Sequence, residues 1–381
     1  MITPLKKQAL DYHQYPKPGK LATSITKPTE TLEDLSLGYT PGVGYPVEAI
    51  AENPMDAYKY TNKGNLVGVI SNGTAVLGLG NVGALASKPV MEGKAVLFKK
   101  MADLDVFDIE IDETDPDKLI DIIASLAPTF GAINLEDIRS PDCFYIEKKL
   151  RERLSIPVFH DDQHGTAIVV TAGLINALKI QNIETNKAKV VLLGAGAAGI
   201  ACANLLLEIG IQIDNLYVAD RSGIIHQQRD LLDFKKPFAK PNAIEIEEAM
   251  TDADVFIGLA APNALHPSYL KKMKEKSIIF ALSNPVPDID PAIVRKHLPK
   301  AIIATGRSDY PNQINNVLAF PYVMRALLDL KVPQVTEAMI ANCARYLAAL
   351  VKDPTADNII IGAFDSRLKD TFIQAISELH G

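Results

Sequence analysis

The sequence predicts an α/β protein of two domains, and three observations lead to this prediction. A length of 381 residues is enough for two domains of ordinary size. After residue 188, short apolar runs alternate with helical or polar segments, as buried parallel strands do. The first of these runs, KVVLL, passes directly into a glycine-rich turn, GAGAAG. We place the boundary between residues 160 and 180 and predict domains at 1–162 and 163–381.

The first domain is predicted to mix strands and helices behind an irregular arm. Residues 12–46 are rich in Pro, Thr, Gly and Tyr, which is typical of an extended arm with turns. The alternation of apolar and acidic residues in VFDIEID, 106–112, indicates a strand. Similar patterns predict two strands within 64–83, strands at 132–138 and 156–160, helices at 115–130, 140–154 and 165–180, and a helix or strand at 94–101.

The second domain is predicted to be a doubly wound sheet that binds a dinucleotide. GAGAAG satisfies G-x-G-x-x-G and stands between a predicted strand and a predicted helix, which is the Rossmann-like context. Gly194 permits the tight turn, Gly196 lets the backbone approach the pyrophosphate, and Gly199 lets the helix pack on the strand. The predicted cofactor-binding residues of the turn are Gly194, Ala195, Gly196, Ala197, Ala198 and Gly199. Further strands are expected at 215–220, 254–260, 278–285 and 301–306, followed by helices in 319–381.

The residues after the second strand of this domain bear on the choice of cofactor. Asp220 ends that strand about 20 residues beyond the turn, where an acid hydrogen-bonds the ribose of NAD. Arg221 and Arg229 follow closely, and an arginine there accommodates the 2′-phosphate of NADP. The sequence therefore predicts NAD or NADP without separating them.

Composition excludes several other classes of protein. Lysine and arginine number 39 against 46 acidic residues, so the net charge of −7 disfavours a nucleic-acid-binding surface. Three cysteines without paired spacing disfavour a disulfide framework and favour a reducing compartment. The first residues contain no apolar signal-peptide core, and no apolar run is long enough to span a membrane. A cytoplasmic protein is expected.

Acidic residues follow two of the predicted strands of the first domain. Glu136 and Asp137 end one strand, and Asp161 and Asp162 follow the next. If these strands are neighbours, the acids converge, because ligands gather at the carboxyl ends of strands in open α/β sheets. Oxygen ligands without thiolates suit Mg²⁺ or Mn²⁺. The alternative, that Asp162 caps the following helix, is equally compatible with its position.

Two histidines flank these aspartates with the spacing of a zinc hydrolase helix. His160 and His164 are four residues apart, but the pattern requires Glu after the first histidine and both histidines on one helix. Asp161 takes the place of that Glu, and His160 closes a predicted strand. The histidines are therefore expected to be polar packing groups or residues that orient the ligands.

Seven stretches, in order along most of the chain, resemble the malic enzyme family, specifically its short bacterial type. They are SLGYTPGV, GLGNVGALASKPVMEGKAVLFK, NLEDI, FHDDQHGTA, GAGAAG, ALSNP and GRSDYPNQINNVLAFP. The resemblance implies an N-terminal malic-enzyme α/β domain followed by a Rossmann-like NAD(P)-binding domain. It also implies oxidative decarboxylation of malate to pyruvate and CO₂, with Mg²⁺ or Mn²⁺ and NAD or NADP as cofactors.

The resemblance also assigns roles to individual residues. It implies that Tyr39 is the proton donor, that Lys94 is the general base, and that Asp161 tunes Lys94. The remaining implied roles are metal ligation by Glu136, Asp137 and Asp162, cofactor contact by Asn284, and substrate contact by Lys94, Asn284, Asn315 and Asn316. A base must be neutral near pH 7, and burial and a nearby cation are expected to lower the pKa of Lys94.

Two positions depart from the family pattern. Gly38 replaces the usual Ala before Tyr39, which is expected to loosen that turn. Ala75 stands where larger members carry an arginine for a malate carboxylate, so Arg307 or Lys88 is expected to substitute.

Three hypotheses about function and assembly accompany this resemblance. The alternative activity is that of a malolactic enzyme, which keeps NAD bound and releases lactate. The non-enzymatic alternative is a dinucleotide-binding regulator. The long arm that carries Tyr39 predicts a homodimer in which the arms help to build or cover the sites.

Overall fold

The first half of the chain forms a parallel four-stranded sheet in the order β2-β1-β3-β4. The computed structural model describes residues 3–76 and 78–380. The strands are β1 (Leu66–Ser71), β2 (Asp105–Glu110), β3 (Ala132–Leu135) and β4 (Val158–His160), connected by helices α5 (Ala84–Ala102), α6 (Pro116–Leu126) and α7 (Asp142–Arg153). Asp115 begins α6 by accepting hydrogen bonds from the N–H groups of Asp117 and Lys118.

Two expectations for this half need correction or completion. Only one of the two strands predicted within residues 64–83 forms, because Gly73, Gly78, Gly80 and Gly83 have positive φ angles that a strand does not continue through. Residues 94–101, for which helix and strand were both open, belong to helix α5. The loop between β1 and α5 is therefore long and rich in glycine.

The second half contains the predicted doubly wound sheet, with strand order β10-β9-β8-β5-β6-β7. Its strands are β5 (Val190–Leu193), β6 (Leu216–Asp220), β7 (Gly223–Ile224), β8 (Val255–Gly258), β9 (Ile278–Ala281) and β10 (Ile302–Thr305), with helices α9 (Ala197–Glu208), α10 (Ile246–Met250) and α11 (Pro291–His297). Only the short strand β7, which the sequence did not indicate, is antiparallel to its neighbour among the described strands. The fold class predicted from the sequence is confirmed.

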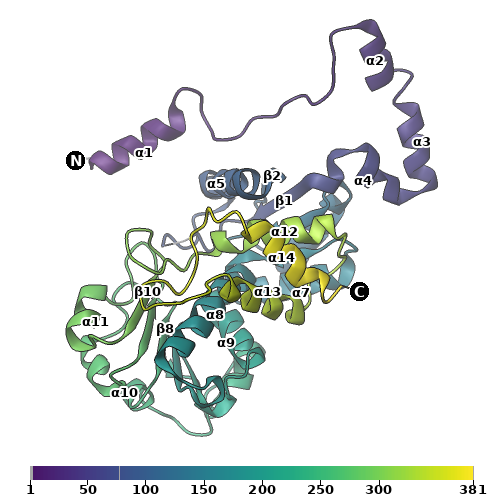
Figure 1. Cartoon of the computed structure of the whole chain (residues 1–381). Helices are drawn as coiled ribbons and strands as arrows, with labels where there is room; N and C mark the ends of the chain where they lie inside the picture. The colour runs from purple at the N-terminus through teal and green to yellow at the C-terminus, as the bar shows by residue number, and fades with distance from the viewer. Residues whose placement is uncertain (1–2, 77, 381) are drawn as a thin grey trace.

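One long helix and the C-terminal helices join the two sheets. Helix α8 (Asp161–Gln181) begins directly after β4 of the first sheet and packs against α9 of the second. Helices α12 (Phe320–Asp329), α13 (Glu337–Ala349) and α14 (Leu368–Ser377) complete this layer (Figure 1). Phe98 of α5 meets Phe320 of α12 edge to face, with ring centroids 4.8 Å apart. One continuous apolar core therefore contains residues from both sheets.

Helices α1 (Pro4–Gln14), α2 (Leu32–Gly38) and α3 (Gly44–Glu52) of the N-terminal arm project away from both sheets (Figure 1), and α4 (Ala57–Tyr60) follows. Within 12–46, predicted to be extended apart from a short helix at TLEDL, α2 forms at that helix, and only the end of α1 and the start of α3 also enter the segment. Among residues 3–65, none is buried. The arm nevertheless bears large apolar side chains, and those of Leu32, Leu37, Tyr39 and Tyr45 are all exposed.

Short 3₁₀ helices occupy several connections. They are η1 (Pro54–Asp56), η2 (Asn62–Asn65), η3 (Ala127–Thr129), η4 (Thr185–Lys187), η5 (Ile213–Asn215), η6 (Asp233–Phe238), η7 (Pro267–Lys272) and η8 (Asn316–Leu318). Within residues 3–76 and 78–380, every helix is too short or too polar to cross a lipid bilayer.

Candidate active site

Four acidic residues lie at the carboxyl ends of two neighbouring strands of the first sheet. Strands β3 and β4 are adjacent and parallel, with Leu135 opposite His160. The chain leaves both strands at the same edge of the sheet, which is where ligands bind in open α/β folds. The acids at this edge are Glu136, Asp137, Asp161 and Asp162.

Three of these acids form a group that fits a divalent cation. One carboxylate oxygen each from Glu136, Asp137 and Asp162 lies within 4.8 Å of the other two. Asp137 Oδ2 is buried and has no hydrogen-bond partner among the described residues. Burial, and then the charges of Asp162 and Glu136, raises the pKa of Asp137 to about 9. A hard cation such as Mg²⁺ or Mn²⁺ would use these oxygens and relieve the crowding of negative charge.

Helix α8 begins four residues earlier than the sequence indicated. It begins at Asp161, and its N-cap is His160, which makes no side-chain capping hydrogen bond. The alternative that Asp162 caps this helix is therefore wrong. Instead, Asp162 Oδ2 accepts a hydrogen bond from the backbone N–H of Asp137 at 2.8 Å, which draws the two carboxylates toward each other.

The two histidines do not share a position from which they could bind zinc. His160 is fully buried, and burial lowers its pKa to about 4. His164 instead contacts Glu147, with its Nε2 2.8 Å from Glu147 Oε1. The helix start at Asp161 leaves His160 outside the helical face that carries His164, so the zinc hydrolase hypothesis has no geometric support.

Lys94 extends from α5 into the acidic edge. Its Nζ lies 2.6 Å from Asp161 Oδ2 and 2.8 Å from Glu136 Oε1, and 4.1 Å from the centre of the Phe320 ring. Burial lowers the pKa of Lys94, but the charges of Asp161 and Glu136 outweigh it and raise the pKa above its ordinary value. Burial alone therefore does not give Lys94 a low pKa, and the expected effect of a nearby cation stays a prediction.

The dinucleotide turn has the close approaches that its glycines predict. Gly194 has φ of 120°, and a Cβ there would lie 2.5 Å from the Leu259 carbonyl oxygen at the end of β8. A Cβ on Gly199 would lie 1.6 Å from the Gly194 carbonyl oxygen. Gly196 is the N-cap of α9 and has no side chain that could cap the helix. The N–H groups of the first turn of α9 are therefore available to a phosphate.

The carboxylate of Asp220 is held by two cations at the end of β6. Arg229 Nη2 donates to both oxygens, at 2.7 and 2.8 Å, and Lys235 Nζ donates to Oδ2 at 2.7 Å. Burial opposes ionisation, but these contacts lower the pKa of Asp220. Arg221 is exposed. Lys235, which lies in a 3₁₀ segment 15 residues further along the chain, was not among the predicted site residues.

Two of the predicted asparagines lie close to glycines. A Cβ on Gly306 would meet Asn284 Nδ2 at 2.4 Å, and a Cβ on Gly165 would meet Asp161 Oδ1 at 1.8 Å and the Asn316 Cβ at 3.3 Å. Asn316 is thus close to the acidic edge. The side chain of Asn315 instead accepts a hydrogen bond from the N–H of Val317.

The structure distinguishes the two cations considered as partners for a malate carboxylate. Lys88 Nζ is 2.7 Å from Asp108 and 3.3 Å from Glu110, so two carboxylates already compete for it. Arg307 pairs with Asp309 and donates to the Pro285 carbonyl oxygen at 2.9 Å, which places it beside the loop that carries Asn284.

The N–H of Ala75 donates to the Asp137 carbonyl oxygen at 2.9 Å. Ala75 thus lies beside a candidate ligand and brings no charge.

Tyr39 is not brought to this site by its own chain. It is the C-cap of α2 and is 72% exposed, within the arm that projects from the sheets (Figure 1). Gly38 lies in the same exposed segment, and a Cβ there would meet nothing within 4 Å. A single chain therefore assembles the candidate base and cation ligands without the candidate proton donor.

The fold and the site define a class of protein: a Rossmann-like dinucleotide-binding domain joined to a second α/β sheet with a carboxylate cluster suited to a divalent cation. Family models described as the malic enzyme N-terminal domain and the malic enzyme NAD binding domain match residues 18–151 and 163–366. The chain belongs to the malic enzyme family.

Individual relatives agree with this assignment. An NADP-dependent malic enzyme of Escherichia coli is 53% identical over 91% of this chain, which spans about half, 46%, of that longer protein. An NADP-dependent malic enzyme of Halomonas elongata is 49% identical over 94% of this chain and 86% of its own length.

Solved structures agree as well. A malic enzyme from Pyrococcus horikoshii superposes with a TM-score of 0.92 at 44% identity, covering 98% of this chain and 90% of that one. An NAD-dependent malic enzyme from Thermotoga maritima also has a TM-score of 0.92, at 43% identity over 97% of this chain and 98% of its own.

Proposed function

We propose that this protein oxidatively decarboxylates malate to pyruvate and CO₂ while reducing NAD⁺ or NADP⁺, with a divalent cation bound. The observation that carries the proposal is the contact of Lys94 with Asp161 and Glu136 at the edge of a three-carboxylate cluster. The names of the relatives, which include both NADP-dependent and NAD-dependent malic enzymes, support the same reaction.

The chemistry requires a base that acts on one hydroxyl proton. Hydride leaves C2 of malate only as the proton of its hydroxyl group is removed, and Lys94 accepts that proton in its neutral form, which a bound cation would favour by offsetting the charges of Asp161 and Glu136. A divalent cation held by Glu136, Asp137 and Asp162 supplies Lewis-acid chemistry, which favours loss of CO₂ from the oxidised substrate. Asp161 holds the Lys94 amine in place and raises its proton affinity.

The remaining roles concern the substrate and the dinucleotide. Asn284 and Asn316, both half-buried, would orient malate, with Asn315 contributing from the start of η8. Arg307 is the better placed partner for a malate carboxylate, because it contacts the loop that carries Asn284. The turn at 194–199 and the residues Asp220 and Arg221 bind the dinucleotide.

The missing proton donor supports a homodimer as part of the same proposal. Exposed Leu32, Leu37 and Tyr45 give the arm an apolar surface that a second copy would cover. Tyr39 on that arm would then protonate C3 of the substrate in the partner's site.

A cytoplasmic location, and a division into modules at 1–162 and 163–381, are further parts of the proposal. The family matches at 18–151 and 163–366 support that division.

The test is an assay of the purified protein with malate, Mn²⁺ and each dinucleotide, which follows the absorbance of the reduced nicotinamide. We expect reduction and an equal amount of pyruvate. Absence of reduction with both dinucleotides would contradict the proposal and favour a dinucleotide-binding regulator. Lactate without net reduction would favour the malolactic alternative, which the names of the relatives do not favour.

A further inference from the structure

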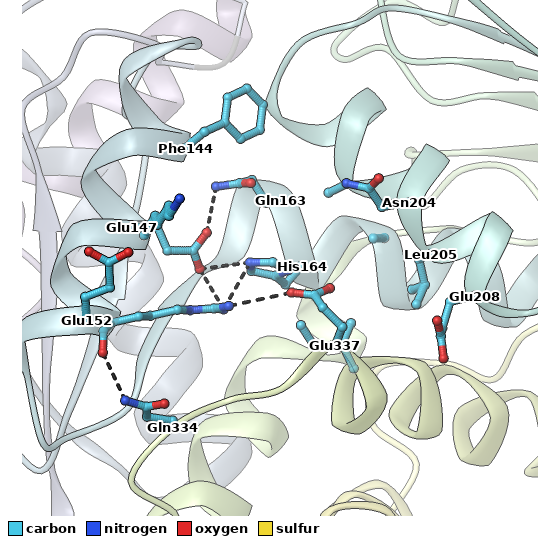
Figure 2. A pocket seen from close by; sticks show the side chains of 15 residues that line it. Phe144, Glu147, Glu152, Gln163, His164, Asn204, Leu205, Glu208, Gln334 and Glu337 are labelled. Carbon is cyan, nitrogen blue, oxygen red and sulfur yellow. Dashed lines mark hydrogen bonds and ion pairs between the residues drawn. The ribbon is translucent and has the colours of Figure 1, made fainter. Parts of the chain in front are cut away.

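A buried carboxylate on α7 lies behind the acidic edge and does not belong to the cation ligands. Glu147 is 5% exposed, and every contact of its carboxylate is with a nitrogen atom. Oε1 accepts from the His160 backbone N–H at 3.2 Å and lies 2.8 Å from both His164 Nε2 and Arg151 Nη2. Oε2 accepts from Gln163 Nε2 at 3.0 Å. Figure 2 shows the contacts of Glu147 with Gln163 and His164 within a cavity of about 710 Å³ between α7, α8, α9 and α13.

Three of these four contacts fall on a single segment, residues 160–164. The segment is the turn from β4 into α8, and it contains Asp161 and Asp162. Asp161 contacts Lys94 and Asp162 contacts the N–H of Asp137, whereas the contacts of Glu147 are with the residues on either side of these two aspartates. The turn is therefore fixed from both directions, by the cluster on one side and by Glu147 on the other.

Without Glu147 the turn would be held mainly from the side of the carboxylate cluster. The N-cap residue His160 makes no side-chain capping bond, and both of its ring nitrogens are without partners among the described residues. The direction of the Asp162 side chain depends on the backbone of the first turn of α8. That backbone is tied to α7 through Glu147 by one backbone contact and two side-chain contacts.

We propose that Glu147 is a positioning residue that sets the affinity of the carboxylate cluster for its divalent cation by holding the 160–164 turn. The inference rests on the proposed cation site. Groups that orient ligands through hydrogen bonds typically contribute 10–100-fold to metal affinity when they are removed. A residue that only stabilised the fold would change the unfolding temperature and leave the affinity of the folded protein unaltered.

The experiment measures binding of Mn²⁺ to the full chain, without malate or dinucleotide, by the electron paramagnetic resonance signal of the free ion. Glu147→Gln keeps the shape of the side chain, but it removes the charge and presents an amide donor toward the donors around it. We expect a dissociation constant for Mn²⁺ about 10–100-fold higher than that of the wild type. An unchanged constant in a folded variant would overturn the proposal.

A matched control lies in the same cavity. Glu337 is exposed and lies 3.6 Å from Arg151, and among the described residues it makes no hydrogen bond or ion pair with residues 160–164 (Figure 2). Glu337→Gln should leave the dissociation constant within about twofold of the wild type, as expected for an exposed ion pair. An equal loss in both variants would overturn the proposal, because it would indicate that the effect comes from the charge of the cavity and not from the turn.

A second variant decides the matter if Glu147→Gln does not fold. Gln163→Met removes one contact between Glu147 and the turn and keeps a side chain of similar size. It should weaken Mn²⁺ binding measurably, and unchanged binding would overturn the proposal. If the wild type itself binds no Mn²⁺, the proposed cation site fails. Binding by the wild type with no change in the variants contradicts only the role of Glu147.

Discussion

Lys94 Nζ lies 2.6 Å from Asp161 Oδ2, and neither side chain is more than slightly exposed. The pair joins the middle of α5 to the first residue of α8, although the two residues are 67 positions apart in the sequence. A buried ion pair of this kind is costly to break, because removal of one partner leaves an uncompensated charge. The contact therefore couples the chemistry proposed for Lys94 to the stability of the first sheet.

Replacement of Lys94 by alanine should separate binding of the dinucleotide from turnover. The turn at 194–199 lies on the second sheet, so we expect the dissociation constant of NAD(P)⁺ to be retained. Turnover should fall by about 10²–10⁴-fold, as for loss of a general base. The unfolding free energy should also fall by about 3–5 kcal/mol, because Asp161 and Glu136 lose their partner.

The control for this prediction is Lys99→Ala, on the same helix. Lys99 is 55% exposed and pairs only with exposed acids, so its variant should keep both turnover and stability. Steady-state kinetics and urea unfolding measure both quantities. Near-normal turnover of a folded Lys94→Ala protein would show that another group is the base.

The position of Tyr39 leads to a complementation experiment. Tyr39→Phe and Lys94→Ala should each be nearly inactive alone. If Tyr39 acts in the partner's site, a mixed dimer contains one intact site, and an equal mixture after exchange of subunits should recover about a quarter of wild-type activity. If Tyr39 acts within its own chain, each site in the mixed dimer lacks one of the two residues and no recovery follows.

Neutralisation of Arg229 should change the preference for the dinucleotide. Arg229 and Lys235 surround Asp220 with more positive than negative charge, which suits a 2′-phosphate. In Arg229→Gln, Asp220 would face the ribose with one cation fewer. We expect kcat/KM for NADP⁺ to fall by about 10–100-fold, the value of one charge-assisted hydrogen bond, with a smaller effect on NAD⁺.

Lys236→Gln is the control for this effect. Lys236 is exposed and contacts Asp233 instead of Asp220, so the ratio of the two kcat/KM values should stay as in the wild type. A fall for NAD⁺ as large as that for NADP⁺ would indicate that Arg229 supports the loop and not the choice of cofactor.

The stability of the protein should depend on Glu147 in acid. Burial disfavours its ionised form, but His164 and Arg151 outweigh burial and lower the pKa of Glu147 to about 2. The unfolded chain therefore takes up this proton first as the pH falls below about 4.5. The contribution of Glu147 is complete above that pH and is lost progressively toward pH 2. Over this window it amounts to about 3 kcal/mol.

Chemical unfolding of the wild type and Glu147→Gln at pH 6, 4 and 3 measures this contribution. We expect the difference in unfolding free energy between the two proteins to shrink as the pH falls. A difference that stays constant across the three conditions would show that Glu147 has an ordinary pKa in the folded protein.

The sequence predicted what depends on local pattern and missed what depends on packing between distant segments. The turn at 194–199 could be assigned because strand, glycines and helix are consecutive. Glu147 lies in the charged run EKKLRER and resembled part of a solvated helix face, since its burial arises only where α8 packs. The contact between Lys235 and Asp220 likewise depends on the path of η6.

The location of Tyr39 could not be predicted for a different physical reason. The capping box between Thr31 and Asp34 determines where α2 begins. It does not determine which surface α2 packs against. The resemblance assigned Tyr39 a role without placing it, and its side chain is exposed on the arm.

The core shared by the two sheets has a consequence for how the protein comes apart. Because α8 starts at the acidic edge and its apolar side chains continue into the second sheet, neither half can lose its structure while the other keeps its own. We expect heat or denaturant to melt both halves in a single cooperative transition. A chain cut after residue 162 would leave two fragments with large apolar faces open to water, and these would aggregate unless expressed together.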